Sequence, residues 1–270
     1  MKKLVTIDLD GTLFDKEKKI SENNKLAIKK AHEMGVKIVI ATGRPITGAM
    51  PVLEELGLTT DNDYAIIYNG AKIFNVGTKE EIYTSTINGK DVRQIYYESL
   101  KLGVYIHAFR KNEELIATTH NPYTDVEARL NKLTEVLVDF NTIKDDEKFL
   151  KCMMVDCDEK VTNAINNINE RFYTDYSMVR SSKIFLEFLN KTTHKGSALQ
   201  TLAEYLNIDI KDTMAIGDAG NDLPMIKIAG IGVAMENAFP EIKQQADYIT
   251  SSNEDSGVAK ALEKFVLNNK

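Results

Sequence analysis

The chain has 270 residues, of which 43% are apolar, so it can bury a sizeable core as one large domain or two modest ones. Its 34 Lys and Arg residues against 40 Asp and Glu residues give a net charge of −6, and no basic tract occurs. This balance excludes nucleic acid and anionic membrane as expected partners, and nothing implies a protein partner. Acidic residues interrupt the first apolar run far short of a signal sequence, and no apolar stretch reaches membrane length. We therefore expect a cytoplasmic protein.

The first segment alternates strand-like and helix-like patterns. We expect strands at 4–7, 36–40 and 64–68, because these short runs are apolar and rich in β-branched residues. A helix should start at Ser21 and stop at Gly35, and a second should end at Gly57. Alternation of this kind predicts a parallel sheet with right-handed crossovers. The apolar residues expected on the first helix are Leu26, Ile28, Ala31 and Met34.

Two aspartates, Asp8 and Asp10, stand at the end of the first strand and are followed by Gly11-Thr12. Strand side chains alternate between faces, so both carboxylates begin on one side. Their mutual repulsion can be relieved by one proton or one cation. The pair could therefore hold a metal and divide the roles of nucleophile and acid/base between its members. The alternative is an acidic turn that merely closes a strand.

Thr42 and Gly43 follow the second predicted strand. A hydroxyl donor and a glycine at that position suit a phosphate, since the backbone can approach it closely. An ordinary surface loop is the alternative for this tripeptide, which ends in Arg44.

The middle of the chain, about residues 84–189, has a different pattern and contains none of the motifs. We expect helices at 92–102 and 161–172 and strands at 104–109, 149–155, 176–179 and 185–189. Cys152 and Cys157 lack zinc spacing, so we expect buried, reduced thiols. The four histidines form no ligand pattern; they are His32, His107, His120 and His194.

The last segment returns to alternating elements. We expect a helix from Lys195, a strand at 213–216, a helix at 222–228, a strand at 231–234 and a final helix through Val258, Leu262 and Val266. Lys195 would lie near a helix N-terminus, which already favours anions, and a solvated surface lysine is the alternative. A loop that carries Asp218, Asn221 and Asp222 follows the strand, and helix capping is its alternative explanation.

These four motifs, in this order, resemble the haloacid dehalogenase (HAD) superfamily of phosphohydrolases, and most closely its Cof-type (HAD-IIB) sugar-phosphatase branch. The resemblance spans nearly the whole chain, and the segment 68–71 also matches that branch. It implies a doubly wound α/β core with a parallel, Rossmann-like sheet, formed by residues 1–83 plus 190–270. An α/β cap domain, residues 84–189, would be inserted into this core.

The resemblance also implies roles for the motif residues. Asp8 would be the nucleophile that forms an aspartyl-phosphate, and Asp10 would be the general acid and base. Mg²⁺ would be bound by Asp8, the main-chain carbonyl of Asp10, and Asp218, while Asp222 would orient Lys195 or a metal-bound water. The phosphoryl oxygens would be held by Thr42, Gly43, Lys195 and Asn221, with the amides of Leu9 and Asp10.

The expected activity is magnesium-dependent hydrolysis of a small phosphate monoester, a sugar phosphate or a related phosphorylated metabolite. Phosphomutase activity and non-catalytic phosphate sensing are the alternatives. The sequence does not name the substrate. Candidate specificity residues are Arg44 and, in the cap, Tyr123, Arg180, Lys183 and Glu187.

Overall fold

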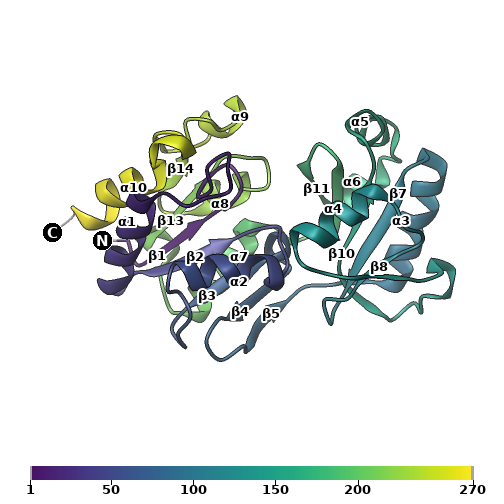
Figure 1. The fold of residues 1–270 in the computed structure, drawn as a ribbon, viewed down its shortest axis with the longest axis horizontal. Helices are drawn as coiled ribbons and strands as arrows, with labels where there is room; N and C mark the ends of the chain where they lie inside the picture. The colour runs from purple at the N-terminus through teal and green to yellow at the C-terminus, as the bar shows by residue number, and fades with distance from the viewer. Residues whose placement is uncertain (1, 269–270) are drawn as a thin grey trace. The chain divides into compact units, whose positions relative to one another are not determined.

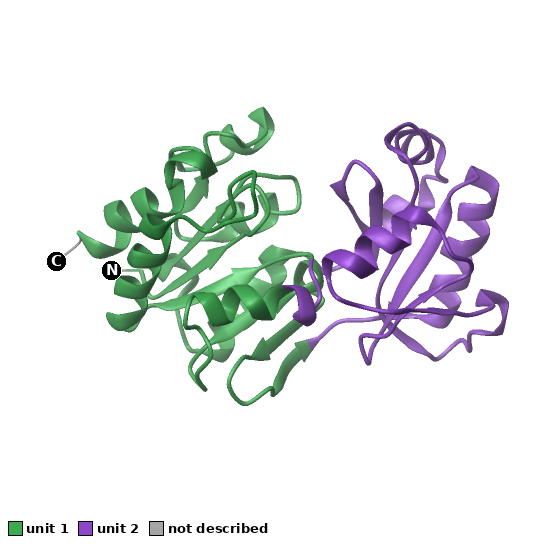
Figure 2. Ribbon diagram, in the orientation of Figure 1, with its two compact units in different colours: residues 1–43, 49–83, 194–270 green, residues 44–48, 84–193 purple. Residues whose placement is uncertain are grey.

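The computed structural model describes residues 2–268, which divide into two compact units (Figure 2). Unit 1 comprises the described residues within 1–43, 49–83 and 194–270, and unit 2 comprises residues 44–48 and 84–193. Each unit has its own sheet and its own buried apolar cluster. Within the described residues, no helix is long and apolar enough to cross a membrane.

Unit 1 is built on an eight-stranded sheet in the order β15-β14-β13-β1-β2-β3-β4-β5 (Figure 1). The pairs from β15 to β3 are parallel, so the predicted parallel core is confirmed. β4 instead runs antiparallel to β3, because a tight turn joins the two strands directly. The strands are β1 (Leu4–Ile7), β2 (Lys37–Ala41), β3 (Tyr64–Ile67), β4 (Lys72–Asn75), β5 (Glu81–Thr84), β13 (Thr213–Gly217), β14 (Gly232–Ala234) and β15 (Tyr248–Ile249).

Helices connect the parallel strands of unit 1. Every residue of β1 and of β13 is buried, as expected where helices cover both faces of a sheet. The helices are α1 (Glu22–Glu33), α2 (Ile46–Glu55), α7 (Lys195–Tyr205), α8 (Leu223–Ile228), α9 (Pro240–Lys243) and α10 (Gly257–Leu262), which continues as a π-helical turn, Glu263–Leu267.

Helix α1 begins and ends where the sequence predicts. The Ser21 hydroxyl accepts the Asn24 N–H at 3.2 Å, and the chain turns away at Gly35. Of the apolar residues on this helix, Ile28 and Ala31 are buried, whereas Leu26 and Met34 are exposed. Asn24 is also buried: its side-chain oxygen accepts the Ala259 N–H at 2.9 Å, whereas its Nδ2 has no hydrogen-bond partner among the described residues.

Unit 2 contains a seven-stranded sheet in the order β11-β12-β10-β7-β8-β9, with β6 also paired to β10. Its pairs are antiparallel except β8 with β9. The strands are β6 (Ile87–Asn88), β7 (Tyr105–Arg110), β8 (Leu115–Ala117), β9 (Glu135–Leu137), β10 (Lys148–Val155), β11 (Tyr176–Ser182) and β12 (Phe185–Asn190), and the helices are α3 (Gly89–Leu102), α4 (Pro122–Leu130), α5 (Asp158–Asn167) and α6 (Arg171–Asp175).

Two sequence-based predictions in unit 2 are wrong. The helix expected at 161–172 is interrupted at Ile168, whose backbone is extended while its side chain is buried in the apolar cluster. Packing of Ile168 therefore overrides the helical periodicity of this segment. Of the two cysteines, Cys152 is buried as expected, whereas Cys157 lies beyond the end of β10 and is partly exposed.

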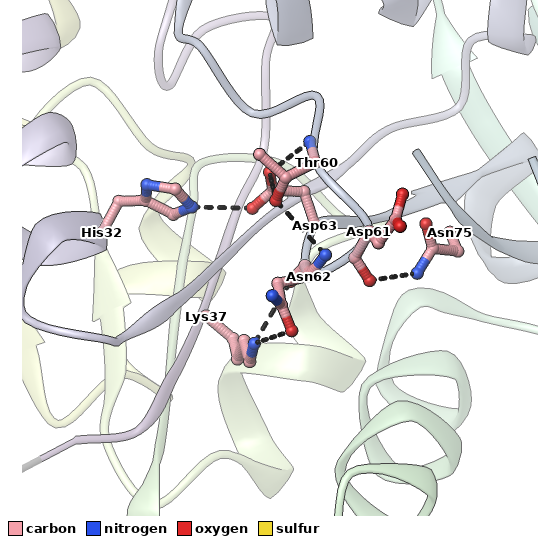
Figure 3. A network of polar contacts seen from close by, with 7 residues as sticks. All are labelled: His32, Lys37, Thr60, Asp61, Asn62, Asp63 and Asn75. Atoms are coloured by element: carbon pink, nitrogen blue, oxygen red, sulfur yellow. Dashed lines mark hydrogen bonds and ion pairs between the residues drawn. The ribbon is translucent and has the colours of Figure 1, made fainter. Parts of the chain in front are cut away.

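A polar turn precedes β3 at the amino end of that strand (Figure 3). The buried Asp63 carboxylate contacts His32 Nε2 at 2.7 Å and accepts the N–H and the hydroxyl of Thr60, at 2.8 and 2.7 Å. One side chain thus links this turn to the end of α1. The motif residues lie beyond the opposite, carboxyl ends of the parallel strands.

Candidate active site

The motif loops of unit 1 follow the carboxyl ends of β1, β2 and β13, with the N-terminus of α7 beside them. Parallel α/β sheets bind ligands at this edge, because the loops from several strands converge there. The sequence motifs, far apart along the chain, are brought to one place by this topology.

Lys195 occupies the first position of α7 and is fully buried. Its Nζ donates to Asp8 Oδ1 at 2.5 Å and to Asp222 Oδ1 at 2.7 Å. The helix starts here because the His194 ring accepts the Ser197 N–H at 2.9 Å and so caps its first turn. Lys195 is therefore fixed between two buried carboxylates rather than solvated at the surface.

Asp222 uses both carboxylate oxygens within the site. Oδ1 accepts from Lys195, and Oδ2 accepts the N–H groups of Asp218 and Ala219, at 2.9 and 3.1 Å. This arrangement holds the loop that presents Asp218 and also positions the lysine. The structure thus places the Asp222 carboxylate in direct contact with Lys195 Nζ.

Asp218 lies across from Asp8, and its Oδ1 accepts the Thr12 hydroxyl at 2.8 Å. Gly11 makes this approach possible. A Cβ built on Gly11 would lie 2.4 Å from Asp218 Oδ2, and the backbone there has φ +88°, which other residues rarely adopt.

The site carries excess negative charge. Ligand atoms of Asp8, Asp218 and Asp222 all lie within 4.8 Å of one another, and one buried ammonium, that of Lys195, contacts two of these carboxylates. Burial, and then the Asp222 carboxylate, raise the pKa of Asp8 well above its usual range. The same two causes raise the pKa of Asp218 to about 6. Burial alone would lower the pKa of Lys195, but its two carboxylate partners outweigh burial and raise it.

These residues fit a hard divalent cation. Asp222 is already occupied by Lys195 and two backbone donors, whereas no described hydrogen-bond donor contacts Oδ2 of Asp8 or of Asp218. Carboxylate oxygens are the ligands that Mg²⁺ prefers, and a cation would relieve the repulsion between the acids. This acidic cluster could hold a divalent metal, and it includes Asp8 and Asp218, two of the three predicted ligands; the third is the main-chain carbonyl of Asp10.

Thr42 and Gly43 follow β2 and lie against the turn Tyr68–Gly70. The buried Thr42 receives the Asn69 N–H at its carbonyl, at 2.9 Å, while its own N–H donates to Ile66 O at the same distance. Asn221, on the loop after β13, donates from Nδ2 to Asn69 Oδ1 at 3.1 Å. Asn69 thus connects two of the predicted phosphate-binding segments.

The turn Tyr68–Gly70 is strained, and its part in the site does not follow from residue patterns. Tyr68, Asn69 and Gly70 have consecutive positive φ values of 52°, 54° and 99°. A left-handed backbone costs about 1–2 kcal/mol for each non-glycine residue. The Asn-Gly pair was the available sequence signal, since both residues tolerate this conformation.

The Asp10 side chain is exposed, unlike that of Asp8, and its Oδ1 contacts Lys18 Nζ at 2.6 Å. Leu9 between them is buried, and its carbonyl accepts the N–H groups of Leu13 and Phe14 at 3.1 and 2.9 Å. The chain therefore turns sharply after β1 and directs the two aspartates into different environments.

The predicted specificity residues have varied surroundings. Glu187 is buried and pairs with the equally buried Lys151 at 3.1 Å, and Arg180 pairs with Asp158 at 2.7 Å. Lys183 is exposed, with Nζ 3.9 Å from Asp158. Burial, and then the Asp156 carboxylate, raise the pKa of Tyr123. Arg44 lies in the short segment 44–48 that groups with unit 2.

The whole chain matches known proteins. The model of the haloacid dehalogenase-like hydrolase family matches residues 5–262. A Streptococcus pyogenes protein named "Putative phosphatase M6_Spy0533" is 38% identical over 268 residues, which are 98% of this chain and 99% of that protein. A Bacillus subtilis protein named 5-amino-6-(5-phospho-D-ribitylamino)uracil phosphatase YcsE is 32% identical over 98% of this chain and 96% of that protein.

Solved structures of haloacid dehalogenase-superfamily proteins also match this chain. A haloacid dehalogenase-like hydrolase from Bacteroides thetaiotaomicron is 33% identical with a TM-score of 0.84, covering 98% of this chain and 99% of that one. A sugar phosphatase of HAD subclass IIB is 27% identical with a TM-score of 0.80, covering 97% of this chain and 98% of that one. The chain belongs to the haloacid dehalogenase-like hydrolase family, as its ordered motifs predicted.

Proposed function

We propose that the protein is a magnesium-dependent phosphatase that hydrolyses a small phosphate monoester through an aspartyl-phosphate on Asp8. The observation that carries this proposal is the buried contact of Lys195 with Asp8 and Asp222, with Asp218 in the same cluster. The names of its relatives support the reaction class.

Asp8 would act as the nucleophile. Lys195 contacts and fixes the Asp8 carboxylate, so that one of its oxygens can attack phosphorus. The new bond joins this oxygen to phosphorus while the bond to the alkoxide of the ester breaks. Water then attacks phosphorus, releases inorganic phosphate and regenerates the Asp8 carboxylate.

Asp10 would handle the protons. It gives a proton to the departing alkoxide in the first step and accepts one from the attacking water in the second. Its exposed carboxylate, on the turn after β1, can meet both a leaving group and a water molecule. Asp8 is held in a buried ion pair and is less suited to that exchange.

The phosphoryl oxygens would be bound by the Thr42 hydroxyl, the Gly43 amide, Asn221 and Lys195, with the amides of Leu9 and Asp10. Held by Asp8, Asp218 and the Asp10 carbonyl, Mg²⁺ would neutralise charge between the carboxylates and the phosphoryl group. Asp222 would keep Lys195 charged and in place.

Unit 2 would act as the cap that selects the substrate. We propose cap boundaries at 84–189 and a catalytic core of 1–83 plus 190–270, acting in the cytoplasm on a small phosphorylated metabolite. The candidate substrate contacts are Arg44, Tyr123, Arg180, Lys183 and Glu187. Three of them also have ion-pair partners within unit 2: Asp158 for Arg180 and Lys183, and Lys151 for Glu187. The relatives' names suggest sugar phosphates and phosphoribityl compounds as the first substrates to try.

A panel of phosphate esters tests the proposal. The purified protein with Mg²⁺ should release inorganic phosphate from at least one of them, and chelation should stop the release. An isomerised ester without net phosphate release would indicate a mutase, and binding without turnover would indicate a sensor; either result would overturn the phosphatase proposal.

A further inference from the structure

Asn69 lies in the strained turn between β3 and β4 and connects two segments that belong to separate sequence motifs. Its backbone N–H donates to Thr42 O at 2.9 Å, and its side-chain oxygen accepts from Asn221 Nδ2 at 3.1 Å. The side chain is almost completely buried. One residue therefore contacts the loop after β2 and the loop after β13 at the same time.

Glycines on both sides allow these contacts. A Cβ built on Gly43 would lie 2.9 Å from Asn69 Nδ2, so the amide packs directly on the Gly43 backbone. A Cβ on Gly70 would lie 2.5 Å from His194 O, which immediately precedes Lys195. The turn is thus wedged between the Thr42–Gly43 loop and the start of α7.

The backbone strain in this turn indicates a function. Tyr68 and Asn69 are both left-handed and buried, a conformation that is rare for a bulky residue such as tyrosine. Strained residues persist where the surroundings fix them, and they concentrate at functional sites. The positive φ values of Asn69 and Gly70 are those of an ordinary Asn-Gly hairpin turn, so the strain that needs an explanation is that of the buried Tyr68 directly before it.

We propose that Asn69 is a positioning residue of this site: its amide holds the Asn221 side chain beside the Thr42–Gly43 loop, so that these groups present fixed hydrogen-bond donors to a phosphoryl group. This inference rests on the proposed function for the identity of the ligand. Asn69 acts through Asn221 and Thr42 rather than on the reacting atoms.

The substitution Asn69→Gly separates this role from the backbone conformation. Glycine keeps the left-handed turn without strain but removes the amide. Asn207→Gly is the matched control, because Asn207 also has a left-handed backbone, with φ 54°, but is exposed after α7. The control should retain wild-type kinetics.

A double-mutant cycle of Asn69→Gly and Asn221→Ala measures the coupling. With nitrophenyl phosphate and Mg²⁺, each single change should lower kcat/KM by roughly 10–100-fold and weaken inhibition by inorganic phosphate by about 5–30-fold. The kcat/KM of the double variant should lie within about 3-fold of that of the less active single variant. Independent effects that multiply would overturn the proposal.

The side-chain amide resonance of Asn221 gives a readout that does not depend on turnover. It should shift in Asn69→Gly and stay in place in Asn207→Gly. Asn69→Asp, which retains the acceptor oxygen and tolerates the left-handed turn, should preserve the hydrogen-bonded resonance even if the glycine variant folds poorly. An unmoved resonance in folded Asn69→Gly, or its loss in Asn69→Asp, would overturn the inference. If the wild type hydrolyses no ester, the proposed function fails, whereas the resonances still decide the role of Asn69.

Discussion

At the scale of single residues, two aspartates separated by one position have opposite surroundings. Asp8 is buried against Lys195, whereas Asp10 is exposed beside Lys18. Buried, immobilised groups suit a nucleophile, and an exposed carboxylate suits proton exchange with the leaving group and water. The two residues should therefore respond differently to mutation.

Asp10→Asn should distinguish the two roles. Sugar-phosphate hydrolysis should fall by roughly 10²–10⁴-fold, because an alkoxide needs a proton in order to leave. With nitrophenyl phosphate, the rate of the first step should fall less. Phosphorylated Asp8 should accumulate, because the second step lacks the base that activates water. Rapid-quench mass spectrometry would detect the phosphopeptide. Asp8→Ala serves as the reference and should abolish turnover of both esters. If Asp10→Asn lowers the hydrolysis rate of both esters equally and no phosphopeptide forms, Asp10 is not the general acid and base.

Asp218→Asn should change the pH dependence of stability. Burial and Asp222 raise the pKa of Asp218 to about 6, so the folded state binds this proton more tightly than the unfolded chain. That contribution to stability is complete below the unfolded pKa, near 4, and is lost as pH rises through about 6. In metal-free buffer the variant should therefore melt at a higher temperature than the wild type above pH 6, with the difference shrinking toward pH 4.

Mg²⁺ should reverse the order of the two melting temperatures, so that the wild type melts above Asp218→Asn. A cation bound by Asp218 stabilises only the folded wild type, so its melting temperature should rise with Mg²⁺ while that of the variant changes little. The surface change Asp209→Asn is a suitable control, since this carboxylate pairs with Lys211 away from the cluster. Equal magnesium responses in wild type and Asp218→Asn would argue against Asp218 as a ligand.

At the scale of elements, the turn before β3 shows how one buried acid fixes the entry of a strand (Figure 3). Asp63 satisfies two donors of Thr60 and contacts His32 at the end of α1. The carboxyl end of the same strand leads into the strained turn Tyr68–Gly70. A well-fixed amino end helps to hold β3 in register while its other end carries that strain.

Asp63→Ala should destabilise the protein by roughly 2–4 kcal/mol, because buried donors lose their acceptor. The exposed neighbour Asp61→Ala should change the free energy of unfolding by less than about 0.5 kcal/mol. Urea denaturation measures both values. Since the turn lies at the opposite strand end from the motif loops, KM of the folded Asp63→Ala protein should stay close to the wild-type value.

At the scale of the whole molecule, two units with separate apolar clusters share one chain. The motif residues lie in unit 1, and all five candidate specificity residues lie in unit 2. This division predicts that chemistry and substrate choice can be separated. Domain-scale opening and closing would then admit the substrate and exclude water.

Replacing the proposed cap, residues 84–189, with a short linker should leave a folded catalytic core that still cleaves nitrophenyl phosphate in a magnesium-dependent way. Its preference among natural esters should flatten, because the selecting surface is gone. The ratios of kcat/KM across the ester panel measure this preference, and circular dichroism checks folding. Unchanged ratios would place specificity in unit 1.

The sequence by itself determined the parallel core, the ends of α1 and the order of the motifs, because local periodicity, caps and glycines set these features. Sequence-based prediction failed where packing overrides periodicity, as at Ile168, whose buried side chain goes with an extended backbone that interrupts the predicted helix. Residue patterns could not predict the contacts of Asn69 or the antiparallel β4. Those features depend on contacts between residues far apart in the chain, and only tertiary packing decides which polar groups are buried together and which strain is retained.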